Sequence, residues 1–462
     1  MVALNLGHIA AVLLCADQVS AFWGLGNWSA KQQAVVVDVP SADDQNADLS
    51  VADTAKLVPR KLIVAMDGTW NFPGNAYDVV SQGGLKTSTS MAPSNIVKLA
   101  YLLQETGRNQ HDLDQSSLKQ IVYYHSGPGT EVADATEHNL EGAFGNIHSH
   151  MLDAYSWLAR EYKEGDEIYA FGFSRGATIV RSLFSFIRHV GLPHAPTPEA
   201  LKLRIADAFE LYRSRIAKDL PTHILRLDKF QREHAYTNVT LKLIGVFDTV
   251  AALTVPQGFV PKGVNKVVSA DLLEDVLEDV GVVEENAYHD LDIGTKVHHA
   301  YHAVAIDENR EYFPPHMFEE VEVEQLGSDF VREQVWFRGS HGDVGGGWWE
   351  HGLTDVTLQW MIEKARTAGL EIRDIVEFDR AFAPFLMGIE REYYLNVKKK
   401  VVHDFFEKYP NGVSPLGKKT PRPLKSLMND SKLFKSSLHE SVNEFSDEFP
   451  LPEPVILVEE SQ

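Results

Sequence analysis

Hydrophobic residues follow two alternating patterns along residues 61–368, and together they predict a layered fold. Short continuous apolar runs are typical of strands that are buried on both faces of a parallel sheet. These runs are Leu62–Met66, Ile121–Tyr124, Ile168–Phe171, Thr240–Phe247, His298–Ile306 and Gln334–Phe337. Between them, apolar residues recur at helical spacing, which predicts helices from Ser94, over about 147–163, after Gly172 and over about 354–368. Strands that alternate with helices indicate βαβ units, so we predict an α/β fold whose mostly parallel sheet has helices on both faces.

The chain divides into three parts by composition. Residues 1–60 hold an apolar stretch, of which residues 1–21 resemble a secretory signal peptide, followed by a polar and acidic linker. This stretch begins without Lys or Arg, so a short amphipathic helix is the alternative, and both a secreted and a cytoplasmic location stay open. Residues 61–370 form the predicted globular α/β domain, and residues 371–462 form a C-terminal extension.

Residues 251–296 look like an insertion between two of the predicted strands. Their helical segment around 271–280 places five apolar side chains on one face: Leu272, Leu273, Val276, Leu277 and Val280. Because the insertion leaves the sheet at the carboxyl end of a strand, we expect it to cover the mouth of a pocket there. The alternative is that it packs against the outer helices.

Charge and cysteine content exclude several classes of protein. The 462-residue chain has a formal net charge of −22, so it gains nothing from counterion release on nucleic acid and is repelled by anionic membranes. Its single cysteine, Cys15, cannot form an internal disulfide or a thiolate metal site. The sequence has no P-loop, no strand-placed GxGxxG motif and no run of 18 apolar residues. We therefore expect no nucleic-acid partner, transmembrane segment, metal or cofactor, whereas the oligomeric state stays open.

The sharpest chemical signal is the GxSxG motif formed by residues 172–176, with Ser174 at its centre. The motif joins an apolar strand directly to an apolar helix, which is the setting in which a serine acts as a nucleophile. Gly172 and Gly176 lack a Cβ atom and so permit a strained turn at this place. The alternative is an ordinary turn in which Ser174 caps the helix, but the context favours a nucleophile.

A serine nucleophile needs a base, and chain position selects one among the 19 histidines. In this type of fold the order along the chain is Ser, acid and His, each after a later strand. His341 follows the last predicted strand and lies in the glycine-rich stretch 339–347. Such a loop is costly in entropy, which favours a functional role for His341 over a histidine that binds a neighbouring carbonyl. Asp343, in the same loop, is a further candidate for lining the site.

Two carboxylates compete for the role of the acid. Asp248 and Asp307 each end a predicted strand between the serine and the histidine. Asp307 precedes the histidine strand, which is the more usual place, but the residues that follow it (Glu308, Asn309 and Arg310) also suit a salt bridge or a turn. Physical reasoning alone leaves this choice open.

The oxyanion hole is predicted to use the backbone N–H of Arg175, the residue after the nucleophile. A second donor is expected from the loop after the first strand, where Gly68 allows close approach of the backbone. Asp67 and Thr69 flank this glycine and are candidates for lining the site, although Asp67 could instead cap the turn.

Six sequence blocks together resemble a known family. In chain order they are LIVAMDGTWN, YYHSGPGT, DEIYAFGFSRGATIVRSL, GVFDTVAAL, AVAIDENREYF and WFRGSHGDVGGGW. They are similar, over about residues 61–368, to the uncharacterised α/β-hydrolase domain family that includes type VI secretion phospholipase effectors. The resemblance implies an α/β-hydrolase fold with Ser174, Asp248 and His341 as a triad, and so favours Asp248 over Asp307. The block YYHSGPGT departs from the family's usual YYxxGVGT, and the resemblance covers neither the N-terminal nor the C-terminal segment.

These features predict a serine hydrolase that cleaves carboxylic esters. Ser174 would attack the carbonyl carbon of an ester or lipid substrate, His341 would transfer the proton, and Asp248 would fix the histidine tautomer. Phospholipase activity is implied by the resemblance alone. The alternative is a binding or regulatory protein on a hydrolase scaffold.

Overall fold

The computed structural model describes most of the α/β domain and parts of the C-terminal extension. The described residues are 59–69, 71, 79–82, 85–88, 92–103, 119–128, 147–215, 220–250, 290–311, 313–320, 330–348, 350–382, 402–404, 407, 411–414, 417–430, 432 and 435–445. The signal peptide predicted at residues 1–21 and the amphipathic helix predicted at residues 271–280 lie outside them. The expected position of that helix over a pocket therefore stays a prediction.

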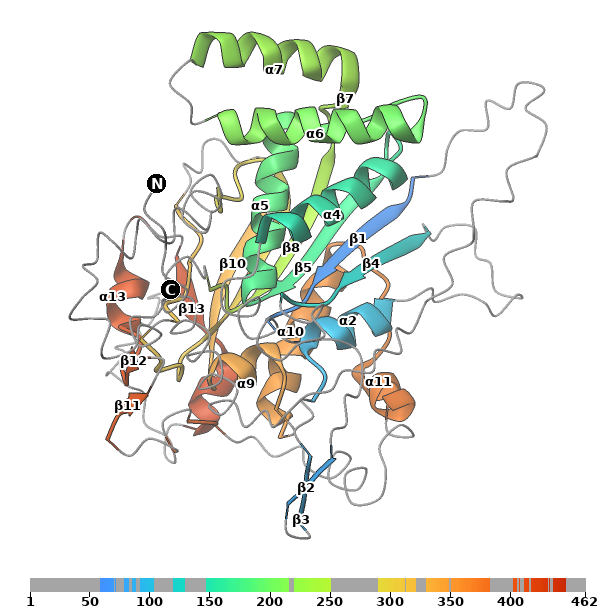
Figure 1. The fold of residues 1–462 in the computed structure, drawn as a ribbon. Helices are drawn as coiled ribbons and strands as arrows, with labels where there is room; N and C mark the ends of the chain where they lie inside the picture. The colour runs from blue at the N-terminus through green and yellow to red at the C-terminus, as the bar shows by residue number, and fades with distance from the viewer. Residues whose placement is uncertain are drawn as a thin grey trace, which may run out of the picture.

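A seven-stranded parallel sheet lies at the centre of the described structure (Figure 1). In spatial order its strands are β13 (Ser436–Leu438), β10 (Val331–Phe337), β9 (Val297–Ala305), β8 (Thr240–Phe247), β5 (Glu167–Phe173), β1 (Lys61–Met66) and β4 (Gln120–His125). Within this sheet the chain runs first through β1, then through the edge strand β4, and then returns to the other side of β1 at β5. Open α/β sheets bind ligands beyond the carboxyl ends of the strands at such a reversal, which places a site between β1 and β5.

Helices cover both faces of this sheet. Alternate residues of β1 point to opposite faces, with Leu62, Val64 and Met66 in one buried cluster and Ile63 and Ala65 in another. The first cluster packs beneath α4 (Ile147–Glu161), α5 (Arg175–Val190) and α6 (Pro198–Ser214). The second packs beneath α2 (Asn95–Leu103), α10 (Gly352–Thr367) and α11 (Ile375–Phe382). The predicted fold class, a parallel α/β sheet with helices on both faces, is confirmed.

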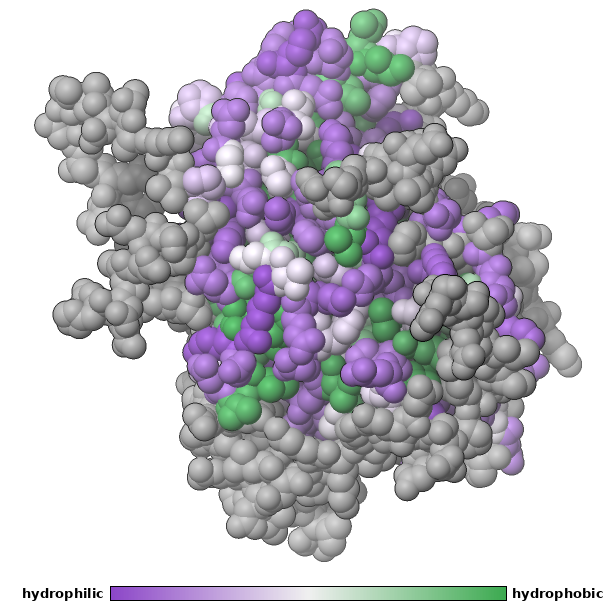
Figure 2. Space-filling model, turned by 180° about the vertical axis from the view of Figure 1, so that it is seen from behind, coloured by the Kyte–Doolittle hydropathy of each residue, from purple (hydrophilic) through white to green (hydrophobic). Residues whose placement is uncertain are grey.

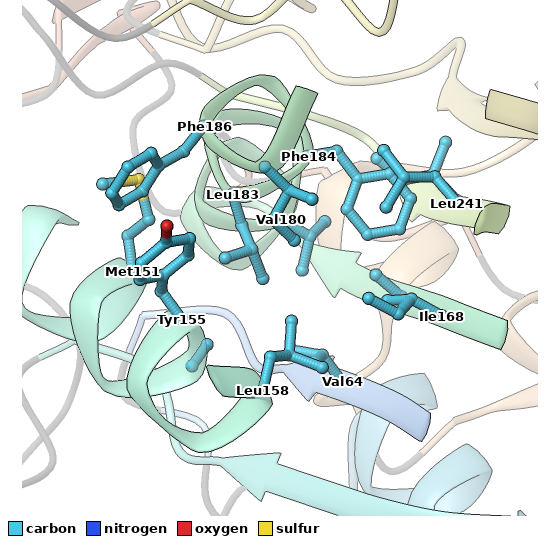
Figure 3. Close-up of a cluster of buried hydrophobic side chains, with 14 of the residues drawn as sticks. Val64, Met151, Tyr155, Leu158, Ile168, Val180, Leu183, Phe184, Phe186 and Leu241 are labelled. Carbon is cyan, nitrogen blue, oxygen red and sulfur yellow. The ribbon is translucent and has the colours of Figure 1, made fainter. Parts of the chain in front are cut away.

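The helix that follows the GxSxG motif, α5, is packed firmly into the larger core. Figure 3 shows Val180, Leu183 and Phe184 of α5 above β1, β5 and β8, and Tyr155 of α4 beside Phe186. The rings of Tyr155 and Phe186 stack with centroids 3.9 Å apart. Burial of each such side chain contributes about 1.5–3 kcal/mol, so the amino end of α5 is held firmly at the carboxyl end of β5.

The C-terminal extension contributes to the same sheet. β13 pairs with β10 in parallel, and a third buried cluster joins Trp336 of β10 to Leu424 and Val442. Leu424 begins α13 (Leu424–Asn429), and Val442 lies in the 3₁₀ helix η6 (Glu440–Phe445). Leu424 and Val442 of the C-terminal extension are therefore anchored near the carboxyl end of β10.

The remaining described elements lie around this framework. They are α7 (Leu220–His234), α9 (His341–Gly345) and the strand pairs β2 (Val79–Gln82) with β3 (Leu85–Ser88), β6 (Leu192–Pro193) with β7 (Ala235–Tyr236), and β11 (Val413–Ser414) with β12 (Gly417–Lys418). In Figure 1 α6 and α7 lie at the opposite end of the sheet from α9.

The face of the molecule seen from behind is mainly hydrophilic (Figure 2). On the face shown in Figure 2, hydrophobic residues form separate small patches among hydrophilic ones. Within the described ranges, no helix combines the length and the apolar character that a bilayer crossing requires.

Candidate active site

Ser174 occupies a strained turn between β5 and α5. Its backbone angles are φ 55° and ψ −121°, a region that costs a residue with a side chain about 1–3 kcal/mol. Among the described residues other than glycine, only Ser174 and Asp248 have a positive φ. Strain of this kind persists where the surrounding structure enforces it and is concentrated at functional sites. Two independent backbone outliers thus fall on two of the predicted site residues.

Asp248 lies beside Ser174 on the neighbouring strand. Phe173 and Phe247 are paired across β5 and β8, and the N–H of Ser174 donates to the carbonyl of Phe247 (3.1 Å). Asp248 is completely buried at the carboxyl end of β8, where its Oδ1 accepts from the N–H of Ala305 (3.0 Å). The sheet register therefore brings the serine and this carboxylate to adjacent strand ends.

The structure brings His341 and Asp248 into direct contact. His341 is the first residue of the short helix α9, and its Nδ1 lies 2.6 Å from Asp248 Oδ2. Because a carboxylate only accepts hydrogen bonds, Nδ1 carries the proton, and Nε2 is left as an acceptor. The imidazole packs between Phe173, which precedes Ser174 (4.7 Å between ring centroids), and Phe313 (5.3 Å). The histidine is thus held in one tautomer beside the β5–α5 turn.

Electrostatics keep Asp248 ionised and His341 neutral. Burial would raise the pKa of Asp248, but the guanidinium of Arg422 and the hydrogen bond from His341 outweigh it and hold that pKa well below its usual range. Burial lowers the pKa of His341, against the opposing effect of Asp248. A neutral imidazole oriented by a carboxylate is the form in which histidine accepts a proton.

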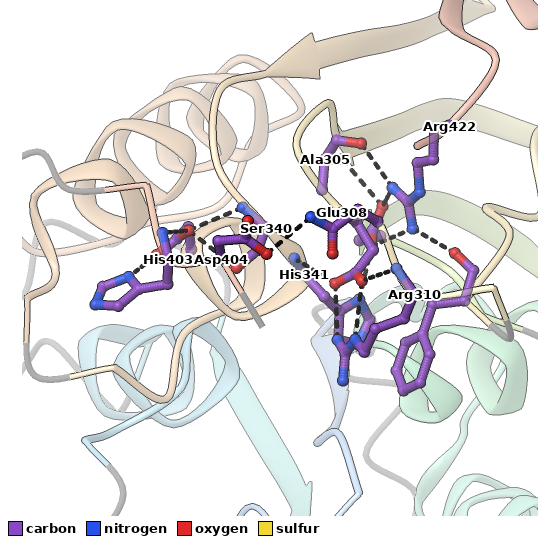
Figure 4. Close-up of polar contacts among 12 residues, drawn as sticks. Ala305, Glu308, Arg310, Ser340, His341, His403, Asp404 and Arg422 are labelled. Carbon is purple, nitrogen blue, oxygen red and sulfur yellow. Dashed lines mark hydrogen bonds and ion pairs between the residues drawn. The ribbon is translucent and has the colours of Figure 1, made fainter. Parts of the chain in front are cut away.

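A buried ion pair supports the loop that carries the histidine (Figure 4). Glu308 pairs with Arg310 (2.7 Å), and its carboxylate also accepts from the backbone N–H of His341 (3.2 Å). Burial opposes ionisation of Glu308, but Arg310 prevails and lowers the pKa of this carboxyl. These two residues, which the sequence indicated only as a salt bridge or turn after Asp307, therefore hold the start of α9.

Asp307 itself points to different partners. Its carboxylate accepts from Arg338 Nε (2.8 Å) and from the N–H of Gly339 (2.7 Å). Asp343 forms a reciprocal capping box with Ser340 at the start of α9 and contacts His403 Nδ1 (2.5 Å). Both acids brace the glycine-rich loop, whereas Asp248 alone of the predicted carboxylates contacts His341 in the described structure.

The loop after β1 is organised by the carboxylate of Asp67. Asp67 Oδ2 accepts from Ser94 (2.8 Å) and from Tyr124 (2.7 Å), and Oδ1 accepts from the N–H of Gly68 (2.7 Å). The backbone N–H of Gly68, the predicted second donor of the oxyanion hole, therefore already donates to Asp67 within this loop. Thr69 Oγ1 accepts from Arg175 Nε (2.6 Å), which ties this loop to the residue after Ser174.

Ionisation of Asp67 is expected to destabilise the fold. Burial raises the pKa of this carboxyl to about 6, against the opposing hydrogen bonds from Tyr124, Ser94 and Gly68. A carboxyl whose folded pKa is raised stabilises the protein fully at low pH and loses that contribution as the pH rises through the folded value. Relative to Asp67→Asn, the wild type should lose about 1–1.5 kcal/mol of unfolding free energy between pH 5 and pH 7.5.

Urea unfolding of both proteins at the two pH values measures this difference, since the other carboxyl groups cancel in the comparison. An equal change in the two proteins would show that Asp67 ionises normally.

The described residues contain no group of three or more His, Cys, Asp or Glu side chains arranged to hold a metal ion. Several contacts of the site have no sequence signal, above all that of Arg422, which lies in a Lys-rich stretch and reaches Asp248 from 174 positions away. Glu308 and Arg310 carried a weak signal because they follow a strand end directly.

Comparison with known proteins matches most of the α/β domain to a defined family. Residues 60–364 match the family described as "T6SS, Phospholipase effector Tle1-like, catalytic domain". Among curated proteins, the uncharacterized protein YEL023C of Saccharomyces cerevisiae is 26% identical over 238 residues, which are 48% of this chain and 29% of that protein. The chain therefore spans less than a third of this relative.

Three solved structures are similar at low identity. An uncharacterized protein from Pseudomonas aeruginosa covers 73% of this chain and 49% of its own (14% identity, TM-score 0.35). The Tle1 effector bound to the VgrG spike of the type 6 secretion system covers 63% of this chain and 51% of its own (18% identity, TM-score 0.31). The propionate-bound esterase Est2 from Thermogutta terrifontis covers 68% of this chain and 86% of its own (13% identity, TM-score 0.32).

Proposed function

Because the chain belongs to the T6SS phospholipase effector Tle1-like catalytic domain family, we propose that it is a serine hydrolase that cleaves carboxylic esters. Ser174 is the nucleophile, His341 the general base and Asp248 the acid that orients it. The observation that carries this proposal is the 2.6 Å contact between His341 Nδ1 and buried Asp248, next to the strained turn at Ser174.

The reaction follows from these positions. His341 Nε2 accepts the proton of Ser174 as its oxygen attacks the ester carbonyl, and the ionised Asp248 stabilises the imidazolium that forms. His341 then returns the proton to the leaving alcohol, and a water molecule repeats the sequence on the acyl-enzyme. We assign the backbone N–H of Arg175, at the amino end of α5, as a donor to the developing oxyanion, and one such donor contributes about 3–4 kcal/mol.

The substrate class is a lipid ester, and a phospholipid is the first candidate. The family description supports this assignment. The net charge of −22 disfavours anionic membranes at long range, so we expect zwitterionic or uncharged lipids to be cleaved faster than anionic ones.

Covalent labelling tests the proposal. A fluorophosphonate should react with the folded protein, and mass spectrometry should place one adduct on the peptide that contains Ser174. Ser174→Ala should abolish this adduct. Ser182→Ala is a matched control, because Ser182 is buried on the same helix and its replacement should leave labelling intact.

An adduct on another residue, or no adduct on a protein with a normal melting transition, would contradict the serine-hydrolase assignment. The second result would favour a binding protein on a hydrolase scaffold.

A further inference from the structure

Arg422 makes an end-on contact with the carboxylate of Asp248 (Figure 4). Nη1 donates to Asp248 Oδ1 (2.6 Å) and Nη2 donates to Oδ2 (2.9 Å). The same two nitrogens donate to the backbone carbonyls of Ala305 (2.7 Å) and Phe313 (2.8 Å). Both charged side chains are buried, with 3% and 0% of their surface exposed. A bidentate pair of this kind fixes the plane of the carboxylate as well as its charge.

The segment that carries Arg422 is itself held in place. The N–H of Thr420 donates to the carbonyl of Asn309 (2.8 Å), and Arg310 and Lys419 form a β-bridge. On the other side, Leu424 is completely buried against the cluster that contains Trp336. The guanidinium therefore reaches the site from a fixed backbone, which lies outside the family match at residues 60–364.

We propose that Arg422 is a positioning residue for catalysis, so that the C-terminal extension completes the active site of the preceding α/β domain. Its guanidinium orients the Asp248 carboxylate toward His341 and keeps it ionised in a buried place. This inference rests on the proposed function, since it acts through the same aspartate and histidine.

Removal of the positive charge should make the Asp248–His341 pair bind a proton more tightly. Without Arg422 the buried pair would carry an uncompensated negative charge, which an added proton removes. That proton would sit either on Asp248, whose hydroxyl would then donate to Nδ1 and leave the histidine proton on Nε2, or on Nε2 itself, so neither form offers Nε2 as an acceptor. Glu308 and Arg310 also act on His341, in opposite directions, and they are paired with each other. His302 of β9 faces Asp248 as well, but burial lowers its pKa to about 3, so it is neutral near pH 7.

The test is the pH dependence of fluorophosphonate labelling at Ser174. The labelling rate should fall at low pH as the Asp248–His341 pair takes up a proton, and this part of the profile is its acid limb. In Arg422→Gln, which keeps a polar side chain but not the charge, the acid limb should move to higher pH by about one unit. Loss of the bidentate contact should also misorient the carboxylate and lower the labelling rate above the acid limb. The rate at pH 7 should therefore fall by about tenfold or more in total, but less than in Asp248→Asn. Nuclear magnetic resonance titration of His341 should show the same upward shift, and this readout does not require activity.

Arg60→Met is the matched control. Arg60 pairs with the buried Asp166 (2.8 Å) at the opposite end of the sheet, so its loss should lower stability and leave the acid limb in place. If Arg422→Gln does not fold, Arg422→Lys replaces it. Lysine keeps the charge but not the bidentate contact, and its labelling rate should fall with little movement of the limb.

The inference would be overturned if Arg422→Gln had the same acid limb and the same His341 titration as the wild type. It would also be overturned if Arg422→Lys were labelled at the wild-type rate. Absence of labelling in the wild type would instead contradict the proposed function, and the His341 titration would still decide the role of Arg422.

Discussion

Asp248→Asn is expected to lower the turnover of an ester such as p-nitrophenyl butyrate by a factor on the order of 10⁴, the size found for a triad aspartate in another serine hydrolase. The asparagine oxygen would accept hydrogen bonds from the guanidinium of Arg422 and the N–H of Ala305, which both donate to Asp248 Oδ1 in the wild type. Its NH₂ group would then face His341 Nδ1 and select the tautomer that carries its proton on Nε2. That tautomer cannot accept the proton of Ser174.

Asp307→Asn is the matched control for this substitution. Asp307 also follows a strand, two residues beyond the end of β9, and also pairs with a buried arginine, Arg338, but it does not contact His341. Loss of either carboxylate should destabilise the fold, because a buried guanidinium then loses the negative charge that compensates its own. Only Asp248→Asn should abolish turnover in the folded protein. Normal turnover in Asp248→Asn, together with lost turnover in Asp307→Asn at an unchanged melting temperature, would reverse the assignment.

The centre of the sheet was predictable because its strands are buried on both faces. The apolar run predicts β8 at Thr240–Phe247, and the structure has the same bounds. β10, by contrast, begins at Val331 rather than at the predicted Gln334. The prediction leaves out the charged residues Arg332 and Glu333. Arg332 is buried and donates to the backbone carbonyl of Gly294, and Glu333 pairs with Lys364 (2.7 Å). A polar residue with a specific partner interrupts the apolar pattern without ending the strand, so periodicity alone misplaces the boundary.

The local parts of the candidate site could be predicted, whereas its long-range partners could not. The GxSxG motif and the glycine-rich loop are properties of a few consecutive residues, and they indicated Ser174 and His341 directly. The contact of His341 with Asp248 depends on how far two parallel strands extend and where each loop turns. Arg422 is one of 43 basic residues and lies 174 positions from Asp248, so only the folded chain reveals the contact.

Gly176→Ala is expected to have the second large effect, because the β5–α5 turn leaves no space for a methyl group. A Cβ atom on Gly176 would lie 2.2 Å from the carbonyl oxygen of Met66 and 2.4 Å from that of Asp67. Both are backbone atoms at the carboxyl end of β1, which is paired on both sides within the sheet. Neither β1 nor α5 can move without breaking the buried core, so we expect a loss of about 3 kcal/mol or more in unfolding free energy.

Gly165→Ala separates this clash from ordinary backbone strain. Gly165 has φ 97°, but the nearest atom to an added Cβ is 3.9 Å away, so its replacement should cost only about 1–2 kcal/mol. Urea unfolding measures both variants, and fluorophosphonate labelling of the folded fraction measures the position of Ser174. Gly176→Ala should also slow labelling, since any relief of the clash moves α5 away from β1 and carries Ser174 with it. A stability loss no larger than that of Gly165→Ala, with an unchanged labelling rate, would show that the turn is not held against β1 and that the strain at Ser174 has another origin.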